Sequence, residues 1–493
     1  MTIAELESVA ARWSSDDEAG SFPVHEAATG RLLARIRAAD AAEIDAAVRG
    51  AHRAFTEDWR HRTGAERGRM LRRAAQLLRE HADEIAEIES REVGKPIEIS
   101  RHYDMVVCAE SFEFFGALAD KIHGDFFPGG PIDTYTIREP YGVVAGIIPF
   151  NWPPVHTAAK AAPALAAGNV VVLKPPEQCP LTVLRITEIL QEVFPGQVVQ
   201  AVPGRGSEAG RALTGHPLVR RISFTGSPAT GRAVLKDAAE HFTGALLELG
   251  GKCPLIVYED ADLDLAVSGA VEGTFFNQGE ACTSASRVLV HDAVADEFIR
   301  RYIAATSRLV VGDGLDPRTH IGAMVTAEHK RNVEAFVETG QLEGAVLAFR
   351  GRIPDDPRLA GGYFVPPTVF TDVTPGMRIA REEIFGPVAS VIRFATDEEA
   401  IEIANGTDFA LVAAVYTQDD QRARRAGREI DAGVVFVNNY NRMFLGTPFG
   451  GNRASGYGRE HAAETLQEFL RTKSVRTPSG RSQVPTWSGA RGT

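Results

Sequence analysis

The spacing of apolar residues changes along the chain, and each change predicts a different kind of element. In the first hundred residues the apolar positions mainly follow the helical period. Asp40 with Glu43, and Thr63 with Glu66, have the spacing of capping boxes ahead of two amphipathic runs, and the second run ends at Gly94. We therefore expect the chain to begin with a mainly helical region.

A regular alternation of short apolar runs and amphipathic runs follows between residues 157 and 251. The predicted helices are TAAKAAPALAAG, LTVLRITEILQEVF, SEAGRALTG and ATGRAVLKDAA, and the predicted strands are NVVVLKP, QVVQAVPG, RRISFTG and ALLELGG. Repeated βα units of this kind predict a parallel sheet that helices cover on both faces. Ligands bind such sheets at the carboxyl ends of the strands.

Further regions flank this alternation. Before it, TYTIREPYG alternates like a partly exposed strand, and GVVAGIIPF is apolar like a buried strand. After it, a second α/β region runs from CPLIVYEDAD to about residue 450. The last strand-like run, EFLRTKSVRT, has no obvious partner nearby in the sequence, so we expect it to pair with a distant segment or with another subunit. A chain of 493 residues is long enough for two or more domains.

Composition narrows the class of function. The formal charge of −12 argues against a nucleic-acid surface, and no apolar run reaches the roughly 18 residues that span a bilayer. Cys108, Cys179, Cys253 and Cys282 do not have the spacing of a zinc site, so we expect no metal centre. The N-terminal segment is acidic and lacks an apolar signal run, which favours a reduced, cytoplasmic protein that acts on a small molecule.

Four segments place polar residues at the ends of apolar runs: PFNWPP (149–154), FTGSPATG (224–231), LELGGK (247–252) and NQGEAC (277–282). Glu248 lies in an otherwise apolar run, and burial raises the pKa of a carboxyl toward that of a general base. A buried glutamate with a structural partner fits that position equally well. Cys282 stands among Gly, Ala, Ser and Thr, which gives a ligand room to approach but also suits tight packing.

Two glycine patterns compete as a dinucleotide site. PGRGSEAG (203–210) is one residue too long for the Rossmann fingerprint. FTGSPATG follows a strand and opens a helix, so Gly226 and Ser227 would present backbone N–H groups and a hydroxyl to a pyrophosphate. The same residues would also serve as an ordinary helix cap.

The motifs PFNWP, GNVVVLKPPE, FTGS, LELGGK, NQGEAC, EEIFGPV and PFGGNRASGYGRE occur in one order along the chain. In that order and spacing the chain closely resembles the aldehyde dehydrogenase superfamily, from about Phe22 to about Arg476. The resemblance implies an aldehyde dehydrogenase-like α/β fold with a cofactor domain (residues 1–118 and 141–249) and a catalytic domain (250–463). It also implies a small β oligomerisation element (119–140 and 464–493) in a homodimer or homotetramer.

The resemblance also implies roles for individual residues. Cys282 would be the nucleophile, Glu248 the general base and Asn151 the side chain of the oxyanion hole, so that an aldehyde becomes a carboxylic acid through a thiohemiacetal and a thioester. The implied contacts to NAD are Lys174, Glu177, Gly206, Phe224, Gly226, Ser227, Gly231, Leu249, Glu383 and Phe385. The implied substrate tunnel contains Trp152, His156, Ala159 and Phe449.

Alternatives remain at this point. Some members of the family pass the acyl group to coenzyme A, but they usually lack the glutamate of LELGG, so Glu248 favours hydrolysis. A cofactor-binding scaffold without turnover is a second alternative, which the presence of Cys282, Glu248 and Asn151 disfavours. Glu177 favours NAD, with NADP as the weaker cofactor, because its carboxylate would repel a 2′-phosphate. The small Ala159 predicts a roomy, partly aromatic pocket for aryl or longer alkyl aldehydes.

Overall fold

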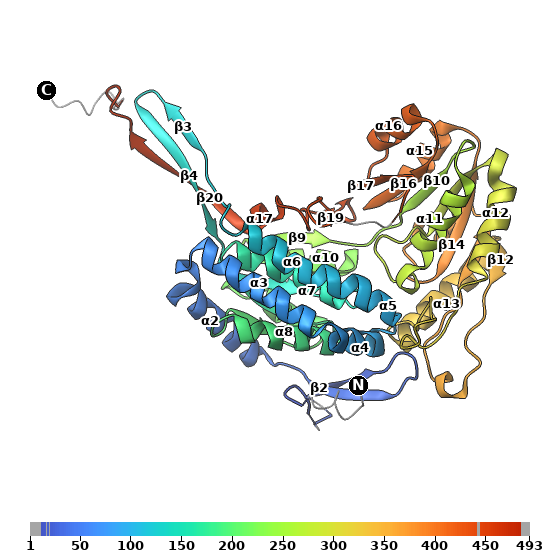
Figure 1. The fold of residues 1–493 in the computed structure, drawn as a ribbon, viewed down its shortest axis with the longest axis horizontal. Helices are drawn as coiled ribbons and strands as arrows, with labels where there is room; N and C mark the ends of the chain where they lie inside the picture. Colours follow the sequence, from blue (N-terminus) through green and yellow to red (C-terminus); the bar gives the residue numbers. More distant parts are fainter. Residues whose placement is uncertain (1–10, 16, 19, 441–443, 485–493) are drawn as a thin grey trace.

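A six-stranded sheet organises the first half of the chain in the computed structural model, which describes residues 11–15, 17–18, 20–440 and 444–484 (Figure 1). The strand order is β19-β9-β8-β5-β6-β7. The strands are β5 (Val143–Ile147), β6 (Val170–Lys174), β7 (Val199–Ala201), β8 (Val219–Thr225), β9 (Gly244–Glu248) and β19 (Gly456–Tyr457). The strands β5 to β9 are parallel to one another, as the alternation predicted, whereas β19 runs antiparallel to β9.

The helices that pack on this sheet are α2 (Ala41–Glu57), α7 (Pro153–Ala166), α8 (Leu181–Val193), α9 (Arg211–Thr214) and α10 (Pro228–Ala239). An outer layer of α3 (Gly64–Glu80), α4 (Ala82–Val93) and α6 (Met105–Leu118) packs against α7 and α8. Both predicted capping boxes form, at Asp40 and at Thr63. The helix α4 ends where Gly94 adopts a φ of +92°, and a Cβ there would meet the carbonyl oxygen of Ala323 at 2.4 Å. The turn therefore requires glycine.

The expectation of a mainly helical first region is wrong for residues 21–37, which form the antiparallel hairpin of β1 (Ser21–His25) and β2 (Leu32–Arg37). Phe22, Val24, Leu33 and Ile36 are buried, and they pack in one cluster with apolar side chains of α4 and α8. The alternation within each strand is too short to stand out beside the long helical runs. The predicted helix SEAGRALTG is confirmed, although its first part is a π-helix, η3 (Gly206–Gly210), which continues into α9.

A seven-stranded sheet organises the second half, in the order β12-β13-β14-β11-β10-β16-β17. Its strands are β10 (Pro254–Val257), β11 (Arg287–His291), β12 (Val346–Arg350), β13 (Thr368–Thr371), β14 (Val388–Phe394), β16 (Val412–Tyr416) and β17 (Val434–Val437). Only its edge strand β12 pairs antiparallel. Its helices are α11 (Leu263–Phe275), α12 (Asp292–Thr306), α13 (Ala327–Leu342), α14 (Arg378–Arg381), α15 (Asp397–Asn405) and α16 (Asp420–Glu429). The predicted second α/β region is therefore present.

A three-stranded sheet projects away from both larger sheets (Figure 1). The C-terminal strand β20 (Leu470–Pro478) pairs antiparallel with β4 (Ile132–Pro140) along its full length, and β4 also pairs with β3 (Phe126–Gly129). The run EFLRTKSVRT thus finds a distant partner in its own chain, as expected. Residues 485–493 of the expected oligomerisation element lie outside the described residues.

The remaining short elements connect these sheets. They are η1 (Trp59–His61), α5 (Ile97–Ile99), η2 (Ser100–Asp104), η4 (Phe276–Gly279), η5 (Pro357–Leu359), α17 (Thr465–Glu468) and the strand pair β15 (Phe409–Ala410) and β18 (Asn452–Arg453). Among the residues that the structure describes, no helix is long and apolar enough to cross a membrane.

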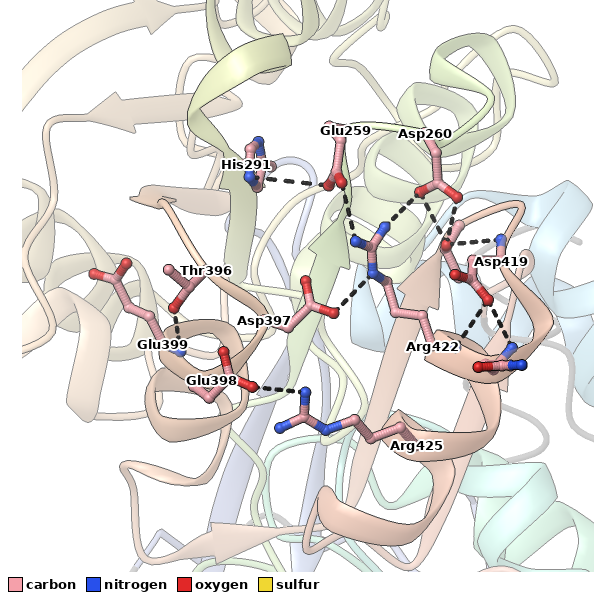
Figure 2. A network of polar contacts seen from close by, with 12 residues as sticks. Glu259, Asp260, His291, Thr396, Asp397, Glu398, Glu399, Asp419, Arg422 and Arg425 are labelled. Atoms are coloured by element: carbon pink, nitrogen blue, oxygen red, sulfur yellow. Dashed lines mark hydrogen bonds and ion pairs between the residues drawn. The ribbon is translucent and has the colours of Figure 1, made fainter.

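An ion-pair network occupies the carboxyl ends of strands in the second sheet (Figure 2). Arg422 of α16 bonds to Glu259 at 2.9 Å and to Asp260 at 3.0 Å, just after β10, and to Asp397 of α15 at 2.9 Å. Its guanidinium also lies 4.6 Å from the ring centroid of Tyr258. These charges fill the edge at which open α/β sheets usually bind ligands.

We predict that Arg422→Met lowers the free energy of unfolding by about 2 kcal/mol, because it leaves three neighbouring carboxylates without their cation. Urea unfolding followed by fluorescence measures the change. Arg425→Met is the matched control, since Arg425 lies on the same helix but its side chain is more exposed and pairs with Glu398 and Glu429 at the surface. Equal losses in the two variants would show that the network adds nothing beyond a surface ion pair.

Candidate active site

A cavity of about 410 Å³ opens at the carboxyl ends of the parallel strands of the first sheet. Its wall consists of residues that directly follow β5, β6, β8 and β9, together with Cys282, His329, Glu383 and Phe385 from the second half of the chain. The strand order reverses at β5, since β6 and β7 lie on one side of it and β8 and β9 on the other. The cavity therefore lies at the switch point where parallel sheets of this kind bind ligands.

The three predicted catalytic residues, Cys282, Glu248 and Asn151, all line this cavity. So do all the predicted cofactor residues except Gly231, namely Lys174, Glu177, Gly206, Phe224, Gly226, Ser227, Leu249, Glu383 and Phe385. Gly231 instead lies inside α10, where a Cβ would approach the side chain of Leu249 to 2.9 Å. Its glycine allows Leu249 to pack between the helix and the cavity.

The thiol of Cys282 and the carboxyl of Glu248 are both buried and close enough to influence each other's titration. Neither carboxyl oxygen of Glu248 has a hydrogen-bond partner among the described residues. Burial, reinforced by the charge of Glu460, raises the pKa of Glu248 to about 8, against the opposing effects of the Cys282 thiol and Lys160. Burial and the charge of Glu248 likewise raise the pKa of Cys282 well above its ordinary value. Both groups therefore hold their protons at pH 7 when no ligand is bound.

The NQG turn places Cys282 by an unusual backbone. Asn277 and Gln278 have φ angles of +53° and +47°, and Gly279 follows at +73°. A Cβ on Gly279 would meet the carbonyl oxygen of Gly386 at 2.3 Å, so the turn packs directly against the EEIFGPV segment. This close approach explains the glycine at position 279, whereas Gly386 is required because a Cβ there would meet the side chain of Val333 at 2.7 Å.

Asn277 also positions the side chain of Asn151, a role that sequence reasoning missed. Its Nδ2 donates to the backbone oxygen of Asn151 at 3.2 Å and to that of Glu280 at 3.0 Å. The Nδ2 of Asn151 donates in turn to the same oxygen of Glu280 at 3.2 Å. An amide nitrogen carries two hydrogens, so this bond fixes one and leaves the other for a ligand in the cavity. The sequence did contain a signal for this role, because Asn277 is the polar residue that opens the motif NQGEAC.

Lys160 is a second missed residue beside the reaction centre. It lies fully buried on α7, and its Nζ donates to Thr225 Oγ1 at 2.8 Å and to Glu460 Oε1 at 2.9 Å. Glu460 belongs to the motif PFGGNRASGYGRE, and its charge reaches Glu248. A lysine inside the apolar run TAAKAAPALAAG was the available signal, because a buried lysine needs an anionic partner.

At one end of the cavity, Glu177 connects two segments. Its Oε2 accepts a hydrogen bond of 2.6 Å from the backbone N–H of Gly206 and lies 3.7 Å from the Nζ of Lys174. Burial lowers the pKa of Lys174, while the charge of Glu177 acts in the opposite direction. The glycine pattern of residues 203–210 therefore presents a backbone N–H to a carboxylate at this end.

The helix α10 begins at the cavity wall. Ser227 is its N-cap and accepts a hydrogen bond of 3.2 Å from the backbone N–H of Thr230, and both residues line the cavity. The helix-cap interpretation of FTGSPATG is therefore confirmed. The N-terminus of this 12-residue helix, which carries the positive end of the helix dipole, therefore lies at the cavity wall.

The EEIFGPV segment forms the other end. Burial raises the pKa of Glu383 to about 7, and its Oε1 accepts a hydrogen bond of 2.9 Å from the backbone N–H of Gly251. Phe385 has a φ of +58°, its oxygen accepts a bond of 2.7 Å from His329, and its ring centroid lies 5.5 Å from that of Phe150. These contacts hold Glu383 and Phe385 against the segments that follow β5 and β9 and against α13.

The predicted substrate residues are Trp152, His156, Ala159 and Phe449. All four are buried, and none of them lines the cavity. Trp152 and Phe449 belong to the same cluster of packed side chains as Cys282. The rings of Trp152 and His156 lie 6.4 Å apart. Two of these side chains thus share a packed cluster with Cys282, and all four lie outside the cavity that holds the predicted cofactor residues.

The sequence model of the aldehyde dehydrogenase family matches residues 13–475. The chain belongs to this family. It is 50% identical to the aldehyde dehydrogenase citD of Monascus ruber over 479 residues, which cover 97% of this chain and 95% of the relative. An aldehyde dehydrogenase of Didymella fabae is 46% identical, with 96% of each chain covered.

Solved structures of aldehyde dehydrogenases share the fold. The crystal structure of PnpE, a protein of Pseudomonas sp. WBC-3, in complex with nicotinamide adenine dinucleotide is 42% identical to this chain. It superimposes with a TM-score of 0.92 and covers 94% of this chain and 96% of its own. A putative aldehyde dehydrogenase from Burkholderia cenocepacia is 41% identical, with a TM-score of 0.92 over 95% of this chain and 96% of its own. The resemblance seen in the motifs and the predicted fold class are confirmed.

Proposed function

We propose that this aldehyde dehydrogenase oxidises an aldehyde to the carboxylic acid, with NAD as the hydride acceptor and Cys282 as the nucleophile. One observation carries the proposal. A single cavity contains the thiol of Cys282, the unpartnered carboxyl of Glu248 and the amide of Asn151 at one part of its wall, and Lys174, Glu177 and the start of α10 at another.

The residues of the cavity fit a dinucleotide. Glu177 and Lys174 offer a carboxylate and an ammonium group to ribose hydroxyls, and the N-terminus of α10 offers N–H groups to a pyrophosphate. Glu383 and Phe385 lie on the side toward Cys282 and would hold the nicotinamide ribose and ring. When bound there, NAD supplies the ring that accepts the hydride from the substrate carbon.

The chain's own residues perform the remaining steps. The thiol of Cys282 loses its proton to water, and its Sγ then forms a bond to the aldehyde carbon while the electrons of the carbonyl π bond move to the oxygen. The oxygen that gains charge accepts hydrogen bonds from the second Nδ2 hydrogen of Asn151 and from the backbone N–H of Cys282. Asn277 keeps that amide in place through the two carbonyl oxygens it holds.

Hydrolysis of the thioester needs a base beside the acylated sulfur. The carboxyl oxygens of Glu248 lack partners in the described part of the chain, so they can accept a hydrogen bond from water and remove its proton. Glu460, held by Lys160, adds a negative charge that keeps Glu248 basic. The position of Glu248 supports transfer of the acyl group to water and disfavours transfer to coenzyme A.

The assembly state and the cellular location are part of the proposal. The sheet of β3, β4 and β20 exposes Phe126, Phe127, Tyr135 and Ile137, which supports a homodimer or homotetramer that buries them. The four free, buried cysteines support a reducing, cytoplasmic location. The domain boundaries inferred from the family remain a prediction.

We predict that Cys282→Ala lowers the rate of NADH formation by about a thousandfold or more, because no other group on the chain replaces the covalent bond. Binding of NAD, measured by quenching of tryptophan fluorescence, is expected to stay within about twofold, because the substitution leaves the dinucleotide contacts intact. Cys108→Ala is the matched control, since Cys108 is equally buried but lies in α6. Substantial turnover by Cys282→Ala would contradict the mechanism.

We predict that kcat rises with pH around a midpoint of about pH 8 and levels off roughly one unit above it, because Glu248 must lose its proton to act as a base and its pKa is raised to about 8. In Glu248→Gln this rise is expected to disappear. A rapid burst of NADH should then precede a slow steady state, because hydrolysis suffers more than acylation. Stopped-flow absorbance across pH 6 to 10 measures both quantities. An unchanged pH profile in the variant would exclude Glu248 as the base.

We predict that kcat/KM with NAD exceeds that with NADP by more than tenfold. Two like charges near 4 Å repel by roughly 4 kcal/mol at an effective dielectric near 20, and solvent screening leaves a fraction of this. About 1.4 kcal/mol suffices for a factor of ten. Glu177→Ser should narrow the gap, whereas Glu208→Ser, which changes an exposed carboxylate in η3 outside the cavity wall, should not. Equal efficiencies in the unmodified enzyme would rule out Glu177 as the selector.

A further inference from the structure

Four buried nitrogen atoms next to the reaction centre have no hydrogen-bond partner in the described ranges of the chain. They are the Nε1 of Trp152, the Nδ1 and Nε2 of His156, and the Nδ1 of His461. All three side chains are less than a tenth exposed. A buried polar group without a partner costs free energy, so several of them in one place indicate that something else forms the missing bonds.

These nitrogens lie close together although they come from two distant segments. Trp152 and His156 stand one turn apart at the start of α7, with ring centroids 6.4 Å apart. His461 follows Glu460, and its charge state influences the pKa of His156. The ring of His461 lies 6.0 Å from that of Phe449, which packs in the same cluster as Cys282 and Trp152. Phe449 and Trp152 thus connect the group to the packed cluster that contains Cys282, and none of its three residues belongs to the wall of the cofactor cavity.

The group offers both donors and acceptors. Burial and the charges of Lys160, His461 and Lys95 hold the pKa of His156 well below its ordinary value, so its ring is neutral at pH 7. A neutral imidazole has one donor and one acceptor, and the indole of Trp152 adds a donor. A hydroxyl group can donate and accept at once and so complements this set. An anion would leave the imidazole acceptor without a donor, and Lys160 and Lys95 are already paired with carboxylates, so neither lysine is available to bind an anion.

Aromatic rings enclose the position on one side. The ring of Tyr103 lies 6.5 Å from Trp152 and 5.6 Å from Phe276, and the rings of Trp152 and Phe276 are 6.5 Å apart. The small side chain of Ala159, which is also buried on α7, takes up little space. Flat or long apolar bodies with a polar substituent suit these surroundings.

We propose that His156, together with Trp152 and His461, binds an uncharged hydroxyl group on the body of the aldehyde substrate. The inference rests on the proposed function, because the hydroxyl reaches this group only when the carbonyl carbon is held at Cys282. It assigns a substrate class, hydroxyl-bearing aldehydes, and makes His156 a specificity residue. A site built to bond a hydroxyl discriminates strongly against the analogue without it, because its own polar atoms then stay unpaired.

The test compares kcat/KM for matched aldehydes by NADH absorbance at saturating NAD. The aromatic series is benzaldehyde and its 2-, 3- and 4-hydroxy derivatives, and the aliphatic pair is hexanal and 6-hydroxyhexanal. At least one hydroxylated aldehyde is expected to exceed its parent by about tenfold or more. His156→Leu should reduce that ratio to about one while the parent aldehyde is still oxidised. His156→Gln, which retains a donor and an acceptor, should restore part of the ratio.

Thr157→Val is the matched control, because it removes a buried hydroxyl from the same turn of α7, where Thr157 already bonds to the oxygen of Pro153 at 2.7 Å. Its ratio should equal that of the unmodified enzyme. If His156→Leu fails to fold, Trp152→Phe tests the same group by removing only the indole N–H, and a partial fall of the ratio is expected.

Two results would overturn the inference. A ratio near one for every pair in the unmodified enzyme would mean that internal water forms the missing bonds. A high ratio that His156→Leu and Trp152→Phe leave unchanged would place the hydroxyl elsewhere. Failure of the proposed function is distinguishable from both, because then benzaldehyde and hexanal would also give no NADH.

Discussion

A buried ion pair holds the reaction centre together. Lys160 and Glu460 are 300 residues apart in the sequence, and both are almost completely removed from water. Neither charge is stable alone in that position, so the C-terminal segment must return to α7 for either to be accommodated. The same lysine holds Thr225 at the end of β8, and the returning segment adds β19 to the edge of β9, which ends at Glu248. The electrostatics of the base thus depend on a contact between the two halves of the chain.

The two large sheets present opposite ends of their strands to the site. The first sheet presents the carboxyl ends of its parallel strands, where loops have room for a dinucleotide. The second sheet meets the site near the beginning of its strands, since β10 starts shortly after Glu248 and β11 shortly after Cys282. Its own carboxyl ends lie elsewhere, filled by the network around Arg422 (Figure 2). The first sheet therefore forms most of the wall of the ligand cavity, while the second sheet supplies the rigid frame for Cys282.

Local patterns in the sequence predicted the local structure well. The alternation of residues 157–251 gave the strands and helices of the first sheet, and the capping pairs at Asp40 and Thr63 formed as expected. The motifs of the first sheet brought their polar residues into one cavity because they lie at the ends of its parallel strands, whereas Cys282 and Glu383 reach the same cavity from segments of the second half of the chain. The hairpin of residues 21–37 was missed, since its strands are short and its burial depends on helices that come later in the chain. Lys160 and Asn277 were missed for the same reason, as their partners are set by tertiary contacts.

The position of β19 and β20 near the end of the chain has a consequence for biosynthesis. A ribosome adds residues from the N-terminus, so β5 to β9 emerge long before Glu460 and the strand that completes the projecting sheet. Until those residues appear, Lys160 lacks its anion and β4 lacks one of its two neighbours. The nascent chain can build its first sheet early, but the charge environment of Glu248 is complete only after the segment with Glu460 has emerged. The order of translation therefore separates the formation of the first sheet from the completion of the reaction centre.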